Sequence, residues 1–154
     1  MDALKISTTI QISKPQNEVF EAIVDPAKMS RYFISESTGR MEEGTNLEWK
    51  FPEFAEEIPV TIVEVSKNEY VSFTWEGARG EKLLVEITLL EVPENSTLVK
   101  ITEREMPNNK KGIKWLAQNT EGWANFLACL KAYLEHGINP VSYTHLTLPT
   151  ISRV

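Results

Sequence analysis

The chain has 154 residues, of which 16 are basic and 22 acidic, giving a formal net charge of -6. That length predicts one domain able to bury a core without disulfides, and the single cysteine, Cys129, excludes an internal one. The acidic balance and scattered basic residues argue against a nucleic-acid partner. No apolar run approaches the roughly 18 residues that a membrane span needs, and no leader pattern appears, so we expect no membrane span and a cytoplasmic protein.

The N-terminal part of the chain predicts one strand followed by two short helices. Residues 5–12 alternate apolar and polar side chains, which is typical of a strand with one wet face. Ser13 and Gln16 have the spacing of a capping box, so a helix is expected over 14–24. The Asp-Pro pair that follows predicts a second short helix over 25–32.

The middle of the chain has the pattern of short strands separated by turns. Glycine, proline and asparagine interrupt runs that are rich in β-branched and aromatic residues. The connections are too short for crossovers, so the strands should pair antiparallel. The strand beginning at Ile58 offers a candidate edge for pairing with a second copy, and nothing else in the sequence indicates an oligomeric state. With the first strand we expect about seven strands, the others at 35–41, 46–51, 58–66, 70–76, 82–91 and 96–104.

A long amphipathic helix is predicted over 109–136, capped by Asn109 and ended by Gly137. At about 40 Å it would cross a small domain and must lie against the sheet. The sequence therefore predicts an α+β fold in which a curved antiparallel sheet encloses the helix. The three-then-four spacing of its expected buried stripe is carried by Leu116, Thr120, Trp123, Leu127, Leu130 and Leu134.

The chain after this helix is expected to be separate from the domain. Residues 141–154 alternate threonine with leucine and isoleucine, yet they follow the element that should complete the fold. An added edge strand and a remnant of expression or gene assembly both fit this pattern. We expect a domain over 1–139 and a tail of doubtful origin over 140–154.

Residues that usually carry catalysis are scarce. His136 stands at the predicted end of the helix, His145 lies in the tail, and neither has metal-ligand spacing with Cys129. Cys129 falls one position off the expected stripe, which favours a half-buried small hydrophobe over a reactive thiol. The glycines form no phosphate-binding loop. We expect no catalytic residues, no metal and no cofactor.

Glu103 is the carboxylate that allows two interpretations. It shares the parity of Val99 and Ile101, the expected inward residues of the last strand, so it could hydrogen-bond a ligand from the concave side. A strand-end residue that faces water is the simpler interpretation and the one expected. The acidic residues at 53–57 are expected to lie in a solvated loop.

Large aromatic residues converge on the expected interior. Side chains two apart in a strand point the same way, so the pairs at 49 and 51 and at 73 and 75 should face the helix. Core filling explains such rings, and so does a ring-walled cavity with polar groups supplied by Asn119 and Thr74. In the second case the ligand-binding candidates are Trp49, Phe51, Phe73, Trp75, Trp115, Asn119, Trp123 and Phe126.

Several local signatures occur in a characteristic order along the chain. They are VFEAIVDP at 19–26, VSFTW at 71–75, STLVKIT at 96–102, and GW at 122–123 followed by YLE at 133–135. In this order they resemble the START-like (SRPBCC, helix-grip) superfamily, and within it the family similar to the activator of heat-shock protein 90 ATPase. The resemblance covers roughly residues 4–137. The chain departs from it at Tyr32-Phe33, where many relatives have a tryptophan followed by an aromatic residue.

The resemblance implies a helix-grip fold with a cavity between the sheet and the C-terminal helix. In this superfamily the cavity serves lipids, polyketides and other hydrophobic molecules, while some members act on chaperones. No catalytic residues carry over, because the shared motifs are structural.

Three functions are consistent with the sequence. The first is a cytoplasmic domain that binds a small hydrophobic or aromatic ligand inside the fold. The second is a chaperone-associated or stress-response module that acts through its surface. The third, an enzyme of the cyclase or hydrolase kind, has the least support because the sequence supplies no matched acid and base.

Overall fold

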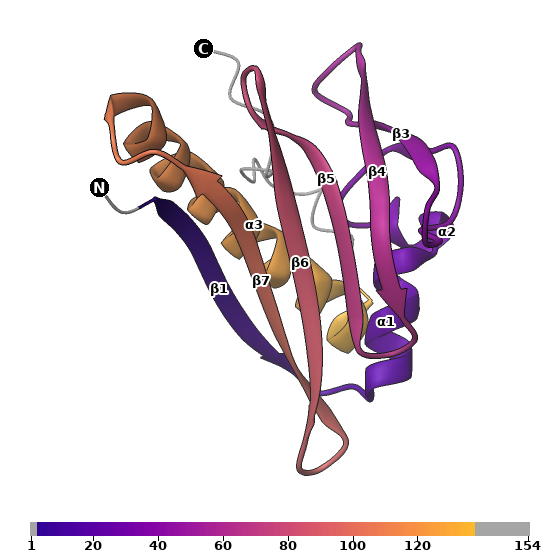
Figure 1. Cartoon of the computed structure of the whole chain (residues 1–154). Helices are drawn as coiled ribbons and strands as arrows, with labels where there is room; N and C mark the ends of the chain where they lie inside the picture. The colour runs from indigo at the N-terminus through magenta and orange to yellow at the C-terminus, as the bar shows by residue number, and fades with distance from the viewer. Residues whose placement is uncertain (1–2, 138–154) are drawn as a thin grey trace.

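A curved antiparallel sheet of seven strands and one long helix form most of the molecule (Figure 1). The computed structural model describes residues 3–137. The sheet order is β1-β7-β6-β5-β4-β3-β2, so β2 to β7 are neighbours in succession, β1 pairs with β7, and β1 and β2 form the two edges. The strands are β1 (Leu4–Ile12), β2 (Glu36–Ser37), β3 (Asn46–Lys50), β4 (Glu57–Ser66), β5 (Tyr70–Ala78), β6 (Glu81–Val92) and β7 (Ser96–Met106). The helices are α1 (Gln16–Val24), α2 (Pro26–Met29) and α3 (Lys110–His136).

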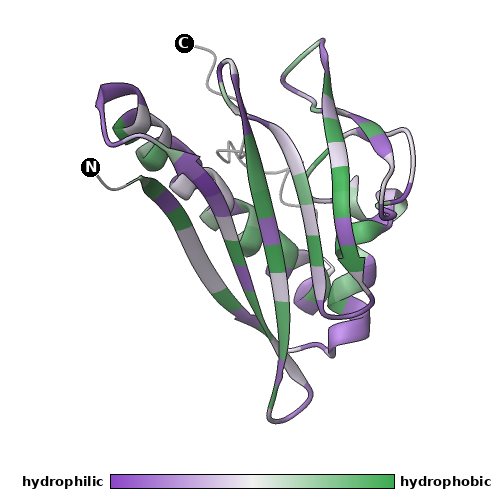
Figure 2. Ribbon diagram, in the orientation of Figure 1, coloured by the Kyte–Doolittle hydropathy of each residue, from purple (hydrophilic) through white to green (hydrophobic). Residues whose placement is uncertain are grey.

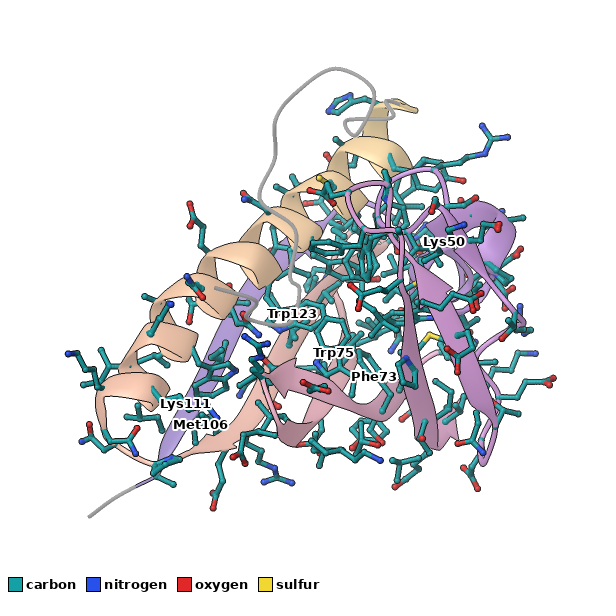
Figure 3. All side chains as sticks on the ribbon, turned by 90° about the horizontal axis from the view of Figure 1, so that it is seen from above. Lys50, Phe73, Trp75, Met106, Lys111 and Trp123 are labelled. Carbon is teal, nitrogen blue, oxygen red and sulfur yellow. The ribbon has the colours of Figure 1, made fainter. Side chains whose placement is uncertain are left out.

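Helix α3 crosses one face of the sheet (Figures 1 and 3). It packs mainly along β1, with further contacts to β7 and α1, while α1 also contacts β6 and β7. Asn109 caps its start by accepting the Gly112 N–H at 2.9 Å, and Gly137 ends it with φ 67°. The predicted α+β helix-grip architecture and both helix ends are confirmed.

The strands bury one face and expose the other, as their period-two patterns predict. In β6 the alternate residues Leu83, Val85, Ile87 and Leu89 are buried, and the residues between them are more exposed. Figure 2 shows this alternation as apolar and polar bands along the long strands. The buried face of the sheet and the inner face of α3 therefore enclose one core.

The buried stripe of α3 is rotated from the prediction. Leu116, Thr120 and Leu134 are only half-buried, whereas Trp115 and Asn119 are 1% and 2% exposed. A periodicity pattern treats every apolar residue alike and does not distinguish side chains by size. In the structure the larger rings fill the deepest space under the helix.

Cys129 also lies deeper than predicted, with 1% of its surface exposed. Burial raises the pKa of its thiol to about 11, because the thiolate would lose its hydration. Cys129 is therefore a packed hydrophobe and not a reactive thiol at neutral pH.

The predicted capping box at Ser13 is wrong. Helix α1 begins at Gln16, and its N-cap residue makes no side-chain hydrogen bond to the helix. The Ser13 N–H donates instead to Glu135 Oε2 at 2.7 Å, and Gln16 Nε2 donates to the Leu89 carbonyl at 3.0 Å. A capping box would pair the Ser13 N–H with the Gln16 side chain, and here each of them binds a residue far along the chain. The bond from Ser13 joins the end of α3 to the end of β1.

Three other predictions also need correction. The second helix ends at Met29, and the strand expected over 35–41 contains only β2. Ile58 is not at a sheet edge, because β4 lies between β3 and β5 and the edges are β1 and β2. The tail expected over 140–154 lies outside the described residues.

Gly112 is held where the chain enters α3, and alanine there should destabilise the fold. A Cβ at Gly112 would overlap the Pro107 carbonyl oxygen. Alanine gains about 1 kcal/mol of helix propensity over glycine, whereas forcing atoms into a packed region costs about 1–3 kcal/mol. The obstacle is backbone and cannot rotate away, so we expect Gly112→Ala to lower the free energy of unfolding in urea melts. The exposed control Lys114→Ala should change it little, and a stabilised Gly112→Ala would contradict this packing.

Candidate functional site

Seven aromatic side chains form one contiguous group between the sheet and α3, here called the ring cluster. Trp123 of α3 points toward Trp75 and Phe73 of β5 (Figure 3), with ring centroids 5.6 Å apart for Trp75–Trp123 and 5.8 Å for Phe73–Trp75. Every member has 1% or less of its surface exposed. The cluster consists of Phe33, Trp49, Phe51, Phe73, Trp75, Trp123 and Phe126.

Phe33 is the member that the sequence analysis did not name as a candidate. Its ring lies 4.7 Å from Phe126, 5.2 Å from Phe51 and 5.7 Å from Trp49, so it joins β3 to α3. Phe33 belongs to the irregular segment after α2, where no periodicity predicts the direction of a side chain. The Tyr32-Phe33 departure from the family pattern was the one signal that pointed to it.

Glu103 of β7 binds three indoles and an amide, and we call this group the Glu103 cluster. Trp75 Nε1 donates to its Oε2 at 2.7 Å. Its Oε1 accepts from Trp115 Nε1 at 3.1 Å, Asn119 Nδ2 at 3.0 Å and Trp123 Nε1 at 3.3 Å. Its relative exposure is 0%, so the expectation that it faces water is wrong. The parity argument that placed it on the concave side is confirmed.

Two opposing effects act on the Glu103 carboxyl. Burial raises its pKa and is the larger, while the hydrogen bonds from Asn119 and the three indoles lower it by favouring the charged form. The net direction is a pKa above the ordinary 4.5. Neither indole nor amide N–H groups ionise near neutral pH, so the cluster contains no acid-base partner for this carboxyl.

A β-bulge at Gly77 creates the space for the Glu103 carboxylate. The register of β5 and β6 shifts between Glu76 and Ala78, and the Gly77 carbonyl accepts the Asn119 Nδ2 group at 2.9 Å. A Cβ at Gly77 would overlap Glu103 Oε2. Only a residue without a side chain leaves room there for the carboxylate, so the bulge and the Glu103 cluster depend on each other.

The structure divides the predicted site residues between these two groups. Trp115 and Asn119 belong to the Glu103 cluster, and Trp75 and Trp123 belong to both. The remaining candidates, Trp49, Phe51, Phe73 and Phe126, lie in the ring cluster. Thr74 is the exception: it is half-buried on the face of β5 opposite to Phe73 and Trp75, so it contributes nothing to this interior.

Trp49 differs from the other three tryptophans in the hydrogen bonding of its indole N–H group. Its Nε1 is buried, and within residues 3–137 it has no hydrogen-bond partner. A buried donor without a partner costs about 1–3 kcal/mol, and such groups are rare in native proteins. The ring cluster therefore presents one unsatisfied donor among apolar rings.

An open groove of about 440 Å³ lies at the C-terminal end of α3, beside α1. Two stacked tyrosines lie between it and the ring cluster: Tyr133 at its edge lies 5.6 Å from the buried Tyr32 at an interplanar angle of 22°, and Tyr32 lies 5.6 Å from Phe126. The Tyr32 hydroxyl donates to the Ala22 carbonyl at 2.9 Å. The groove is lined by Asn17, Glu18, Glu21, Lys28, Tyr133, Leu134 and Gly137.

The described part of the chain offers neither a metal site nor a membrane-spanning helix. Across residues 3–137, no group of three or more histidine, cysteine, aspartate or glutamate side chains could hold a metal ion. None of the helices in that range is long and apolar enough to cross a membrane.

Comparison with known families matches most of the chain. The profile of the family described as "Activator of Hsp90 ATPase homolog 1-like protein" matches residues 13–135. The chain belongs to this family. The matched range begins just after β1, includes α1, α2 and the strands β2 to β7, and ends one residue before the end of α3. Comparison with curated protein sequences gives no match.

Solved structures share the fold. The protein SSP2350 from Staphylococcus saprophyticus is 34% identical with a TM-score of 0.78, covering 88% of this chain and 95% of that one. The Aha1 dimer from Colwellia psychrerythraea is 20% identical with a TM-score of 0.72, covering 87% and 98% of the two chains. DynU16, described as a putative protein in the dynemicin biosynthetic locus, is 23% identical with a TM-score of 0.76, covering 88% and 48%. The last two show the fold alone.

Proposed function

We propose that this protein is a cytoplasmic domain that binds a small apolar or aromatic ligand between the sheet and α3. The observation that carries the proposal is the ring cluster, in which β3, β5, α3 and the segment after α2 bring seven buried rings together. Small-molecule sites in proteins are mostly apolar and aromatic, with a few polar groups that orient the ligand. The Trp49 N–H and the Glu103 cluster are the polar groups here.

The arrangement of the rings supports this proposal. Phe33 meets Trp49, Phe51 and Phe126 at interplanar angles of 83°, 81° and 76°. Edge-to-face contacts of this kind are also the favourable geometry for a bound aromatic ring against these side chains. The groove beside Tyr133 is the proposed entrance, and the stacked rings of Tyr133 and Tyr32 lie between it and Phe126 of the cluster.

A surface role toward a chaperone is the second candidate. The family description supports it, because it names activation of the Hsp90 ATPase. The Aha1 dimer structure shares the fold. An enzymatic role has less support, since both Glu103 oxygens already accept hydrogen bonds from N–H groups that do not ionise near neutral pH.

Quenching of tryptophan fluorescence by a panel of neutral ligands tests the proposal. We expect saturable quenching by flat aromatic compounds of naphthalene size and weaker quenching by aliphatic alcohols, because the rings provide stacking partners as well as apolar surface. Phe51→Leu removes one ring from the cluster and should weaken the binding several-fold.

The matched control is Leu90→Ala, which changes a side chain 53% exposed on the outside of β6. It should leave the affinity unchanged. If no compound saturates, and the purified protein stimulates the ATPase of purified Hsp90, the binding proposal fails and the chaperone role takes its place.

A further inference from the structure

The Trp49 N–H indicates the chemistry of the ligand, and this inference rests on the proposed function. Trp49 stands on β3, with 1% of its surface exposed and its Nε1 fully buried. Among the described residues this donor has no acceptor. The other three indole N–H groups all donate to one carboxylate. Three of the four tryptophans are thus satisfied within the fold, and the fourth is not.

The surroundings of Trp49 are aromatic. Its ring lies 5.2 Å from Phe73, 5.7 Å from Phe33 and 6.1 Å from Trp75, each in an edge-to-face contact. A phenylalanine in its place would fill similar space without burying a donor. A molecule that meets Trp49 therefore places a ring against Phe33 and Phe73 and gains most if it also supplies an acceptor to Nε1.

Charge selects the kind of acceptor. Trp75 contacts the Trp49 ring and also donates to Glu103, so a buried carboxyl lies one ring away. A carboxylate or phosphate ligand would be desolvated close to this group, and the chain as a whole carries a net charge of -6. A neutral oxygen such as a ketone carbonyl or a phenol avoids both costs.

We propose that the ligand is a neutral aromatic molecule with an oxygen acceptor at the edge of its ring system, and that Trp49 Nε1 donates a hydrogen bond to that oxygen. Trp49 is then a determinant of specificity, while the rings around it supply most of the affinity. Acceptor-bearing and acceptor-free ligands of the same shape should bind with different affinities.

Two isosteric probes test this in the wild-type protein. 2-Acetylnaphthalene carries a carbonyl where 2-isopropenylnaphthalene carries a methylene group, and the shapes are otherwise alike. We expect about tenfold tighter binding of the ketone, equivalent to ~1.4 kcal/mol. In ¹H–¹⁵N spectra of the indole groups, the Trp49 proton should move downfield with the ketone and not with the hydrocarbon.

Two variants separate the donor from the ring. Trp49→Phe should bind both probes with similar affinity, because phenylalanine keeps an aromatic ring at this position and lacks the donor. Phe73→Leu should weaken both probes while keeping their ratio.

Three results would overturn the inference. Equal binding of the probes by the wild type, with an unmoved Trp49 signal, rejects the acceptor and leaves the binding proposal standing. A Trp49 proton that is already downfield without ligand, and stays there, shows that water satisfies the donor. Binding of neither probe removes the binding proposal and this inference with it.

Discussion

Replacing Glu103 by leucine should remove most of the stability of the fold, and replacing it by glutamine should remove a smaller part. Leucine leaves the N–H groups of Trp75, Trp115 and Trp123 buried without an acceptor, at about 1–3 kcal/mol each. Glutamine keeps one oxygen but places an NH₂ group against one side of the cluster, so about 1–3 kcal/mol is lost. Urea unfolding followed by tryptophan fluorescence measures both differences.

Glu105 provides the control for this experiment. It is an exposed glutamate two residues further along β7, so Glu105→Gln should change the free energy of unfolding by less than about 0.5 kcal/mol. If Glu103→Leu were as stable as Glu105→Gln, the buried carboxylate would not be the acceptor that the indoles require.

The stability difference between the wild type and Glu103→Gln should depend on pH. Burial raises the pKa of Glu103 above 4.5, so the native state holds the proton more tightly than the unfolded chain does. The stability that this group contributes is therefore full below about pH 4.5 and is lost as the pH rises through the raised pKa. We expect the stability difference between wild type and Glu103→Gln to be larger at about pH 4 than at about pH 7.

Alanine at Gly77 should destabilise the protein by about 2–3 kcal/mol, the second-largest effect we expect. The new Cβ would overlap Glu103 Oε2 and would lie 3.0 Å from the Leu83 Cδ1 atom. A carboxylate on a free side chain would simply rotate away. Here four hydrogen bonds hold it, so moving it breaks the 2.7 Å bond from Trp75 and disturbs the others.

Gly39→Ala is the matched control for Gly77→Ala. A Cβ at Gly39 would lie 3.5 Å from Leu47 Cδ2, which is an ordinary contact. We expect a change within about 0.5 kcal/mol there, measured by the same denaturant melts. Equal stabilities of the two alanine variants would show that the carboxylate does not depend on the space at Gly77.

The effects of Gly77→Ala and Glu103→Gln on the free energy of unfolding should not be additive. Gly77→Ala already displaces the Glu103 carboxylate, so adding Glu103→Gln should cost less in that background than in the wild type. A double-mutant cycle measures this coupling.

The sequence predicted well what local periodicity controls. The alternation of β6 and the long run of α3 each follow from a repeat that one element carries by itself. The same reasoning placed Trp49, Phe73 and Trp75 on the inward face, because two-residue spacing decides which way a strand side chain points. These features need no knowledge of distant parts of the chain.

What the sequence did not predict depends on partners from different elements. Glu103 becomes a buried acceptor only because β5 and α3 bring donors to it, and no local pattern on β7 records them. The capping box at Ser13 failed for the same reason, since Glu135 accepts the Ser13 N–H that the Gln16 side chain would accept in such a box. Phe33 lies in an irregular segment of backbone, where no repeat in the sequence predicts which way a side chain points.

The indole N–H spectrum of the ligand-free wild type tests the central claim most directly: Glu103 satisfies three tryptophans, and Trp49 has no acceptor among residues 3–137. With signals assigned by single tryptophan-to-phenylalanine variants, the protons of Trp75, Trp115 and Trp123 should lie downfield of the Trp49 proton and exchange more slowly with solvent deuterium. A Trp49 proton as far downfield as the other three, or three signals at the position of an exposed indole, would contradict the account.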